Sequence, residues 1–231
     1  MEKGGRAAIL GAIVLLVVVW QLPYGRLALY PLSLLATYVH EMGHGLTALL
    51  VGAHFDRLVM FADGSGFAEW RGDVGRLARG AIAAGGLLGP SILGGAVVAS
   101  SRVPKLSRAL LFGSAGILAL TAVLFAGSVF TIAFVVGWAI LLGSAARFLS
   151  PRLALFFTQL LGATLCLSIF QDLSYMFSDG AVVGGVARRS DSAAIADALF
   201  LPYWFWGAMV AAAALSALGL GLAAAFRAPR I

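Results

Sequence analysis

One short segment has the residue types and the spacing that bind a metal ion and activate water. Residues 40–44 read His40-Glu41-Met42-Gly43-His44, an H-E-x-x-H sequence. On a helix, residues four apart lie one turn apart on the same face, so both imidazoles can reach one ion. Imidazole nitrogens are common zinc ligands, and the adjacent Glu41 can accept a proton from the attacking water as a general base. The segment predicts a hydrolase that uses one Zn²⁺ per chain, with His40 and His44 as ligands and Glu41 as the catalytic base.

A catalytic zinc site needs a third protein ligand and keeps one position open for water. His54 lies ten residues after His44, at the predicted membrane edge, and we interpret it as a histidine at headgroup level. Asp172 is the only acid in its long apolar stretch, which runs toward the same side of the membrane as the stretch that carries the histidines. We therefore expect Asp172 to be the third ligand, with Asp179 as the alternative.

Composition places these residues in a membrane protein. Of the 231 residues, 61% are hydrophobic and only 11% are charged, whereas soluble domains are about half apolar and about a quarter charged. The mean hydropathy is +0.98. An ordinary soluble globular protein is thereby excluded.

Long uncharged stretches predict where the chain crosses the bilayer, since about 20 apolar residues span its core as a helix. The uncharged run from Ala109 to Ala146 is too long for one crossing and is expected to turn near Ala126-Gly127-Ser128. We predict an all-α polytopic membrane protein that forms a single membrane-embedded domain over residues 1–231, with about seven transmembrane helices. These cover residues 7–22, 27–51, 80–101, 109–126, 129–146, 153–175 and 201–226.

The polar groups of the H-E-x-x-H segment lie inside the second predicted span. Ionisable residues at bilayer depth are costly and usually have a partner or a function, which supports a metal site there. The net charge of +6 is explained by anionic lipid headgroups rather than by nucleic acid, because the basic residues lie in short connections. The single Cys166 excludes an intramolecular disulfide and a cysteine metal cluster.

The polar interval 52–79 has the pattern of a small membrane-associated β-hairpin. Residues 57–61 alternate like a strand, Asp63-Gly64 is a turn signal, and residues 66–70 can return. We expect the first strand to offer an edge at Val59 and Met60. An unwound substrate segment can pair with such an edge through its main chain.

Gly85, Gly89 and Pro90 mark the next predicted span. Gly85 and Gly89 form a small-xxx-small face that lets helices approach closely, and Pro90 frees a backbone carbonyl. Helix packing explains this pattern; a wall of the substrate cavity is the additional functional interpretation.

Together these residues resemble the site-2-protease-like intramembrane metallopeptidases of family M50, in particular the M50B-like branch. The zinc motif with the small residue after His44, the hairpin and the Gly-Pro run carry the resemblance, and Asp172 matches the position of the distal ligand. The resemblance implies an endopeptidase that cuts membrane-protein substrates in or near transmembrane segments. Ser190-Asp191-Ser192-Ala193 resembles a Ser-Asp-Ala segment of that branch, and we include Asp191 as a possible outer-shell residue. Better-known branches carry an Asn- and Pro-containing motif before an Asp-Gly pair; here Asp179-Gly180 lacks it, which keeps Asp179 as the alternative.

Charge bias gives no orientation, because the 16 Lys and Arg residues divide eight and eight between the two sides of the predicted topology. The resemblance implies a zinc helix that runs into the cytoplasm of a bacterial inner membrane, with the N-terminus cytoplasmic and the C-terminus outside. Nothing in the sequence specifies an oligomeric state. The alternatives to a peptidase are a catalytically inactive M50-like scaffold and a zinc-binding or zinc-transporting membrane protein; retention of Glu41 argues against the first, and the single ligand cluster argues against transport.

Overall fold

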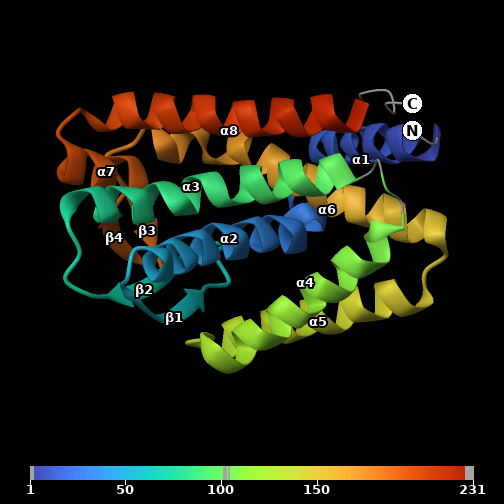
Figure 1. Cartoon of the computed structure of the whole chain (residues 1–231), viewed down its shortest axis with the longest axis horizontal. Helices are drawn as coiled ribbons and strands as arrows, with labels where there is room; N and C mark the ends of the chain where they lie inside the picture. The colour runs from blue at the N-terminus through green and yellow to red at the C-terminus, as the bar shows by residue number, and fades with distance from the viewer. Residues whose placement is uncertain (1–2, 101–102, 104, 227–231) are drawn as a thin grey trace.

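The computed structural model describes residues 3–100, 103 and 105–226. Long helices lie side by side along the longest axis of the molecule, and short helix α7 and two strand pairs gather at one end (Figure 1). We call this the hairpin end. The helices are α1 (Lys3–Gln21), α2 (Gly25–Leu50), α3 (Arg76–Ala99), α4 (Leu106–Leu124), α5 (Val129–Phe148), α6 (Pro151–Met176), α7 (Asp191–Leu199) and α8 (Tyr203–Phe226).

Six of these helices, α1, α3, α4, α5, α6 and α8, are long and apolar enough to cross a membrane. Helix α2 has 26 residues, enough for a crossing at 1.5 Å per residue, but His40, Glu41 and His44 make it more polar. The protein is a polytopic, mainly helical membrane protein. The expected turn between residues 126 and 128 is confirmed, since α4 ends at Leu124 and α5 begins at Val129.

The predicted hairpin after the zinc helix is confirmed. Strands β1 (His54–Met60) and β2 (Gly66–Arg71) pair antiparallel, with Leu58 opposite Ala68 and Met60 opposite Gly66. The other edge of β1 is already occupied by the connection between α4 and α5. The Leu58 N–H donates to the Phe125 carbonyl at 2.6 Å, and the Leu58 carbonyl accepts from the Gly127 N–H at 2.8 Å.

The structure contains a second hairpin that the sequence analysis does not predict. Strands β3 (Gly180–Val183) and β4 (Val186–Arg189) pair antiparallel between α6 and α7. Its turn meets the turn of the first hairpin: the Gly184 N–H donates to Ser65 Oγ at 3.1 Å. Gly184 has φ +56°, and a side chain there would overlap the ring of Phe61, so this close approach requires glycine.

Helix α2 is packed on two sides, which fixes the face that carries the motif. One side joins Leu34, Tyr38 and Met42 to a buried cluster with α4, α5 and β1. The other side lies against α3, where a Cβ at Gly43 would overlap the Gly85 carbonyl and a Cβ at Gly85 would overlap the Thr47 side chain. The packing interpretation of the glycine pattern therefore holds for Gly85.

The two described ends of the chain lie together, at the end of the bundle opposite the hairpins (Figure 1). The Arg6 guanidinium donates to the carbonyl of Phe226 at 3.1 Å. This contact contradicts the expectation that the N- and C-termini lie on opposite sides of the membrane. The numbers of Lys and Arg on the two predicted sides were equal, so the sequence contains no charge bias from which the side of the N-terminus could be predicted.

Candidate metal centre

The second half of α2 carries all three residues of the motif toward the hairpin end. His40 and His44 lie one turn apart, with their Nε2 atoms 3.1 Å from each other. Glu41 and His44 are buried, and the His40 side chain is only 13% exposed. Helix α2 therefore brings both imidazoles to one point, as the spacing predicts.

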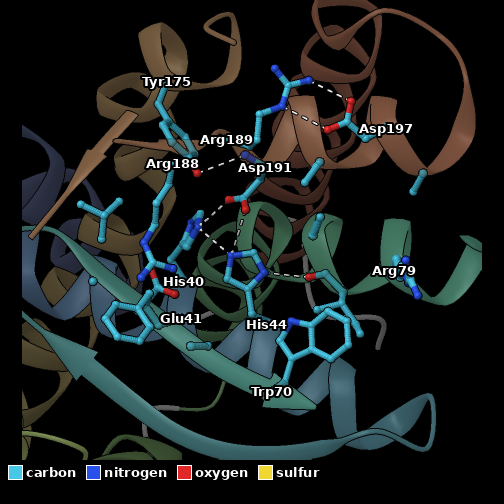
Figure 2. A pocket seen from close by; sticks show the side chains of 18 of the residues that line it. His40, Glu41, His44, Trp70, Arg79, Tyr175, Arg188, Arg189, Asp191 and Asp197 are labelled. Atoms are coloured by element: carbon cyan, nitrogen blue, oxygen red, sulfur yellow. Dashed lines mark hydrogen bonds and ion pairs between the residues drawn. The ribbon is translucent and has the colours of Figure 1, made fainter. Parts of the chain in front are cut away.

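The third residue at that point is Asp191, the first residue of α7. Its Oδ2 lies 2.9 Å from His40 Nε2, and its Oδ1 lies 3.3 Å from His44 Nε2. Figure 2 shows the carboxylate reaching down from α7 between the two rings. His40, His44 and Asp191 each offer one ligand atom, and these atoms lie within 4.8 Å of one another.

The spacing of these donor atoms fits a tetrahedral zinc ion. Ligands at about 2.0–2.1 Å from zinc in a tetrahedron lie about 3.3 Å apart. The two Nε2 atoms are 3.1 Å apart, and the two oxygens of Asp191 lie 2.9 Å from His40 Nε2 and 3.3 Å from His44 Nε2 respectively. Two imidazoles and a carboxylate with a fourth position left open form the donor set of catalytic zinc sites. The residues present therefore fit this metal.

A hydrogen bond on the far side of His44 sets which nitrogen faces the cluster. His44 Nδ1 lies 2.8 Å from the carbonyl of Ile82 in α3. A carbonyl can only accept, so Nδ1 carries a proton, and Nε2 is the nitrogen that can give up its proton to bind a metal ion. Such outer partners orient metal-binding histidines and make them better ligands.

Contacts from α6 and β4 hold Asp191 in place. Its N–H donates to the Tyr175 hydroxyl at 3.1 Å, and the preceding Ser190 caps α7 by accepting from the Ala193 N–H at 3.2 Å. Arg189 pairs with Asp179 and with Asp197, at 2.6 and 2.8 Å. These contacts tie the end of α6 to both ends of α7.

The Asp191 carboxyl lies outside the membrane-spanning helices and stays ionised. Burial would raise its pKa, but attraction to His44 and hydrogen bonds with both imidazoles outweigh burial and hold the pKa well below its usual range. An ionised carboxylate is the form that binds a metal.

A cavity of about 700 Å³ opens onto the metal centre. The motif forms one wall, β2 a second, and the start of α3 with α7 and β4 the rest (Figure 2). A second cavity of about 330 Å³ shares His40, Glu41, Gly66, Tyr175 and Val183 with the first and extends toward Asp63 and Asp172. The motif therefore lies between two cavities lined by both polar and apolar groups, with room for both water and an extended chain.

The family model for Peptidase M50B-like proteins matches residues 8–221, which is most of the chain. The chain belongs to this family. Searches of the curated proteins and of the solved structures gave no match. Membership of an intramembrane-peptidase family agrees with a metal centre at the end of an apolar helix bundle.

The geometry of this M50B-like protein brings Asp191, and not the expected Asp172, beside the two histidines. Asp172 is half-buried on α6 and lines the second cavity with His40 and Glu41, but it is not in the three-residue cluster. Asp179 points to Arg189 instead, and His54 begins β1 on the exposed surface. After α6 the chain folds back through β3 and β4, and this return brings Asp191, expected only in the outer shell, to the histidines.

The other residues that the sequence analysis singled out lie near the site but not at its surface. Val59 and Met60 are buried, and the Met60 N–H donates to Thr131 Oγ1 at 2.9 Å, on the edge of β1 that faces α5. Gly85, Gly89 and Pro90 line neither of the two cavities. They support the site through the packing of α3 on α2.

Sequence reasoning missed Gly86, which lies directly against the motif. A Cβ at Gly86 would overlap the ring of His44. The one indication of this contact in the sequence is that Gly86 directly follows Gly85. For Asp191 a local signal existed: Ser190 has the residue type of an N-cap directly before an acid, which is typical of a helix start.

Proposed function

We propose that this protein is an intramembrane zinc endopeptidase that hydrolyses peptide bonds in or near transmembrane segments of membrane proteins. The observation that carries the proposal is the convergence of His40, His44 and Asp191 in a cavity that also contains Glu41. M50B-like membership gives the class of reaction. Apolar helices give the environment in which it takes place.

In this proposal His40, His44 and Asp191 hold one Zn²⁺ per chain. When bound, zinc supplies Lewis acidity that polarises the substrate carbonyl and makes water nucleophilic near neutral pH. His44 is oriented by Ile82, and Asp191 is oriented by Tyr175. The ligand atoms are thereby positioned before substrate arrives.

Glu41 is the proposed general base. It follows His40 directly, lines both cavities and is 7% exposed. Within the described residues its carboxylate forms no ion pair with Lys or Arg, so it remains available to accept a proton from water and to pass it to the leaving amine. The second cavity, with Asp172 and Asp63 in its wall, gives water a polar approach to Glu41.

The substrate must lie extended at the site, because a helix hides its peptide groups in internal hydrogen bonds. The free edge for pairing belongs to β2, not to β1. In an antiparallel pair, the N–H and C=O groups of successive residues point alternately toward and away from the partner strand. Leu58 points these groups toward the α4–α5 connection, so the N–H and C=O of its partner Ala68 point away from β1. Ala68 and Gly66 line the cavity, and we propose that an unwound substrate segment pairs with this edge.

A zinc transporter is the less supported alternative. Transport needs successive ligand groups along a path, and among the described residues the three-residue cluster is the single such group. The presence of Glu41 beside the cluster favours hydrolysis over an inactive scaffold.

The test is cleavage by the purified protein in lipid nanodiscs. Wild type is expected to cut transmembrane peptides that contain Gly or Pro near one end. A chelator should abolish this activity and added zinc should restore it. If zinc-loaded protein cuts no such peptide whereas a matched, zinc-loaded active M50 peptidase does, the proposed function is wrong.

A further inference from the structure

The described arginines at the hairpin end fall into two groups, according to whether they form an ion pair with a carboxylate. Three of them pair with carboxylates: Arg57 with Glu69, Arg71 with Asp56, and Arg189 with Asp179 and Asp197. In the described part of the chain, the other three form no ion pair with a carboxylate. They are Arg76, Arg79 and Arg188, and all three line the cavity at the metal centre.

The carboxylates of this cavity do not balance those charges. Asp191 is engaged by the two histidines, and Asp197 is engaged by Arg189. Glu41 lies beside the ligands and is needed there as the base. The cavity therefore presents cationic side chains that are not neutralised by carboxylates of the described chain and can bind an anionic group from outside it.

Two of the three arginines are free to bind such a partner. Arg76 has a structural role, because its guanidinium lies 4.0 Å from the centre of the Phe200 ring and donates to the Ala198 carbonyl. Arg188 lies over the ring of Phe67 on β2, at 4.5 Å, which holds its charge beside the β2 edge. Arg79 uses only its Nε, in a bond of 3.2 Å to the Val74 carbonyl, so its terminal nitrogens remain available.

These two arginines lie on opposite sides of the metal centre. Figure 2 shows Arg188 beyond His40 and Glu41, and Arg79 on the far side of His44. A chain that crosses the centre in an extended conformation would meet one guanidinium before the histidines and the other after them. Helix stability does not explain Arg79, because a cation near the N-terminus of α3 opposes the helix dipole.

We propose that this cavity selects substrates with acidic side chains on both sides of the bond that is cut, one bound by Arg79 and the other by Arg188. The proposal rests on the proposed peptidase function and names its substrate class. A guanidinium binds a carboxylate with paired hydrogen bonds, which gives position as well as charge attraction. Lipid phosphates are the competing partner, but both arginines line the cavity that contains the catalytic base, where a lipid headgroup would compete with substrate.

The test measures binding and cleavage with one pair of peptides. Both peptides share the same transmembrane sequence with a Gly-Pro-weakened end; one carries Glu and Asp on both flanks of that end, and the other carries Gln and Asn. Binding is measured with zinc-loaded Glu41→Gln protein in phosphatidylcholine nanodiscs, by fluorescence anisotropy. Cleavage is measured with the Glu41 protein in the same nanodiscs.

The acidic peptide should bind about tenfold more tightly than the amide peptide, since each partly exposed ion pair contributes a few-fold in affinity. Arg79→Gln and Arg188→Gln should each lower this preference about threefold, and the preference should weaken with added salt. Arg57→Gln is the matched control: it removes a cation from the same end of the molecule, but one that is paired with Glu69 outside the cavity. It should leave the preference unchanged.

Equal binding of the two peptides by the Glu41→Gln protein would overturn the proposal. So would an affinity that depends on phosphatidylglycerol in the nanodisc and not on the peptide flanks, because the arginines would then bind lipid. Cleavage of both peptides at equal rates would leave the peptidase function standing without the selectivity. Conversely, arginine-dependent preference for the acidic peptide without any cleavage would support the binding site and contradict the peptidase function.

Discussion

Oδ2 of Asp191 lies 2.9 Å from Nε2 of His40, although 151 residues separate the two in the chain. The contact joins the start of α7 to the middle of α2 and completes a set of donor atoms that fits zinc. It makes Asp191, among the acids at or after the end of α6, the one that we propose as the third ligand. The assignment can be tested directly by metal content.

Asp191→Ala should lower zinc affinity by more than about 100-fold, because even outer partners of metal ligands are worth about 10–100-fold. Asp172→Ala and Asp179→Ala are the matched controls, since each removes one carboxylate from the same end of the molecule. Metal analysis of the purified variants checks this. Zinc loss in Asp172→Ala, with normal zinc in Asp191→Ala, would restore Asp172 as the ligand.

Glu41→Gln should keep its zinc and its thermal stability but lose hydrolysis. Glutamine preserves the size of the side chain and removes the proton acceptor, and lost general-base catalysis costs about 10²–10⁴-fold in rate. Single-turnover cleavage and metal analysis on the same sample separate the two properties. A variant that cuts peptides at the wild-type rate would show that Glu41 is not the base.

Gly86→Ala should displace the His44 ring and release zinc. The added methyl would overlap that ring, and cores tolerate such overpacking only by moving side chains. Gly89→Ala is the control on the same helix: its Cβ would lie 3.2 Å from the Val39 carbonyl and would not touch His44. Similar zinc content in both variants would argue against close support of His44 by α3.

Proline in the two strands of the first hairpin should have different effects. Ala68→Pro removes a main-chain donor that faces the cavity and should reduce cleavage while zinc content is unchanged. Met60→Pro removes the donor to Thr131 Oγ1, which keeps its contact with Ser128 Oγ, so the lost hydrogen bond should cost about 0.5–1.5 kcal/mol of stability. Thermal unfolding and cleavage assays on both variants check this; normal cleavage by Ala68→Pro would rule out pairing at the β2 edge.

The contact between the two hairpins should stabilise the peptidase site. Gly184→Ala and Gly185→Ala both place alanine at positive φ, which costs about 1–2 kcal/mol, but only the first would overlap Phe61. We therefore expect Gly184→Ala to lower the unfolding midpoint and the cleavage rate more than Gly185→Ala does. Equal effects of the two would mean that backbone conformation alone is responsible.

The sequence by itself determined the features that depend on local spacing. The step of four between His40 and His44 places the two proposed ligands on one face beside the proposed base, because helix periodicity alone does so. Uncharged stretches of about 20 residues predict membrane helices, and the Asp63-Gly64 turn predicts the β1–β2 hairpin. Each of these signals is contained within one element.

Tertiary structure decided which acid lies beside the two histidines, which strand edge is free and how the termini pack. Asp191 reaches His40 only because β3 and β4 reverse the chain after α6, and no periodicity in the sequence specifies that return. Similarly, residues 125–127 form hydrogen bonds with the outer edge of β1, and they reach it only because α4 and α5 pack beside α2. Contacts between distant segments follow from how whole elements pack, and the pattern within a single element does not contain that information.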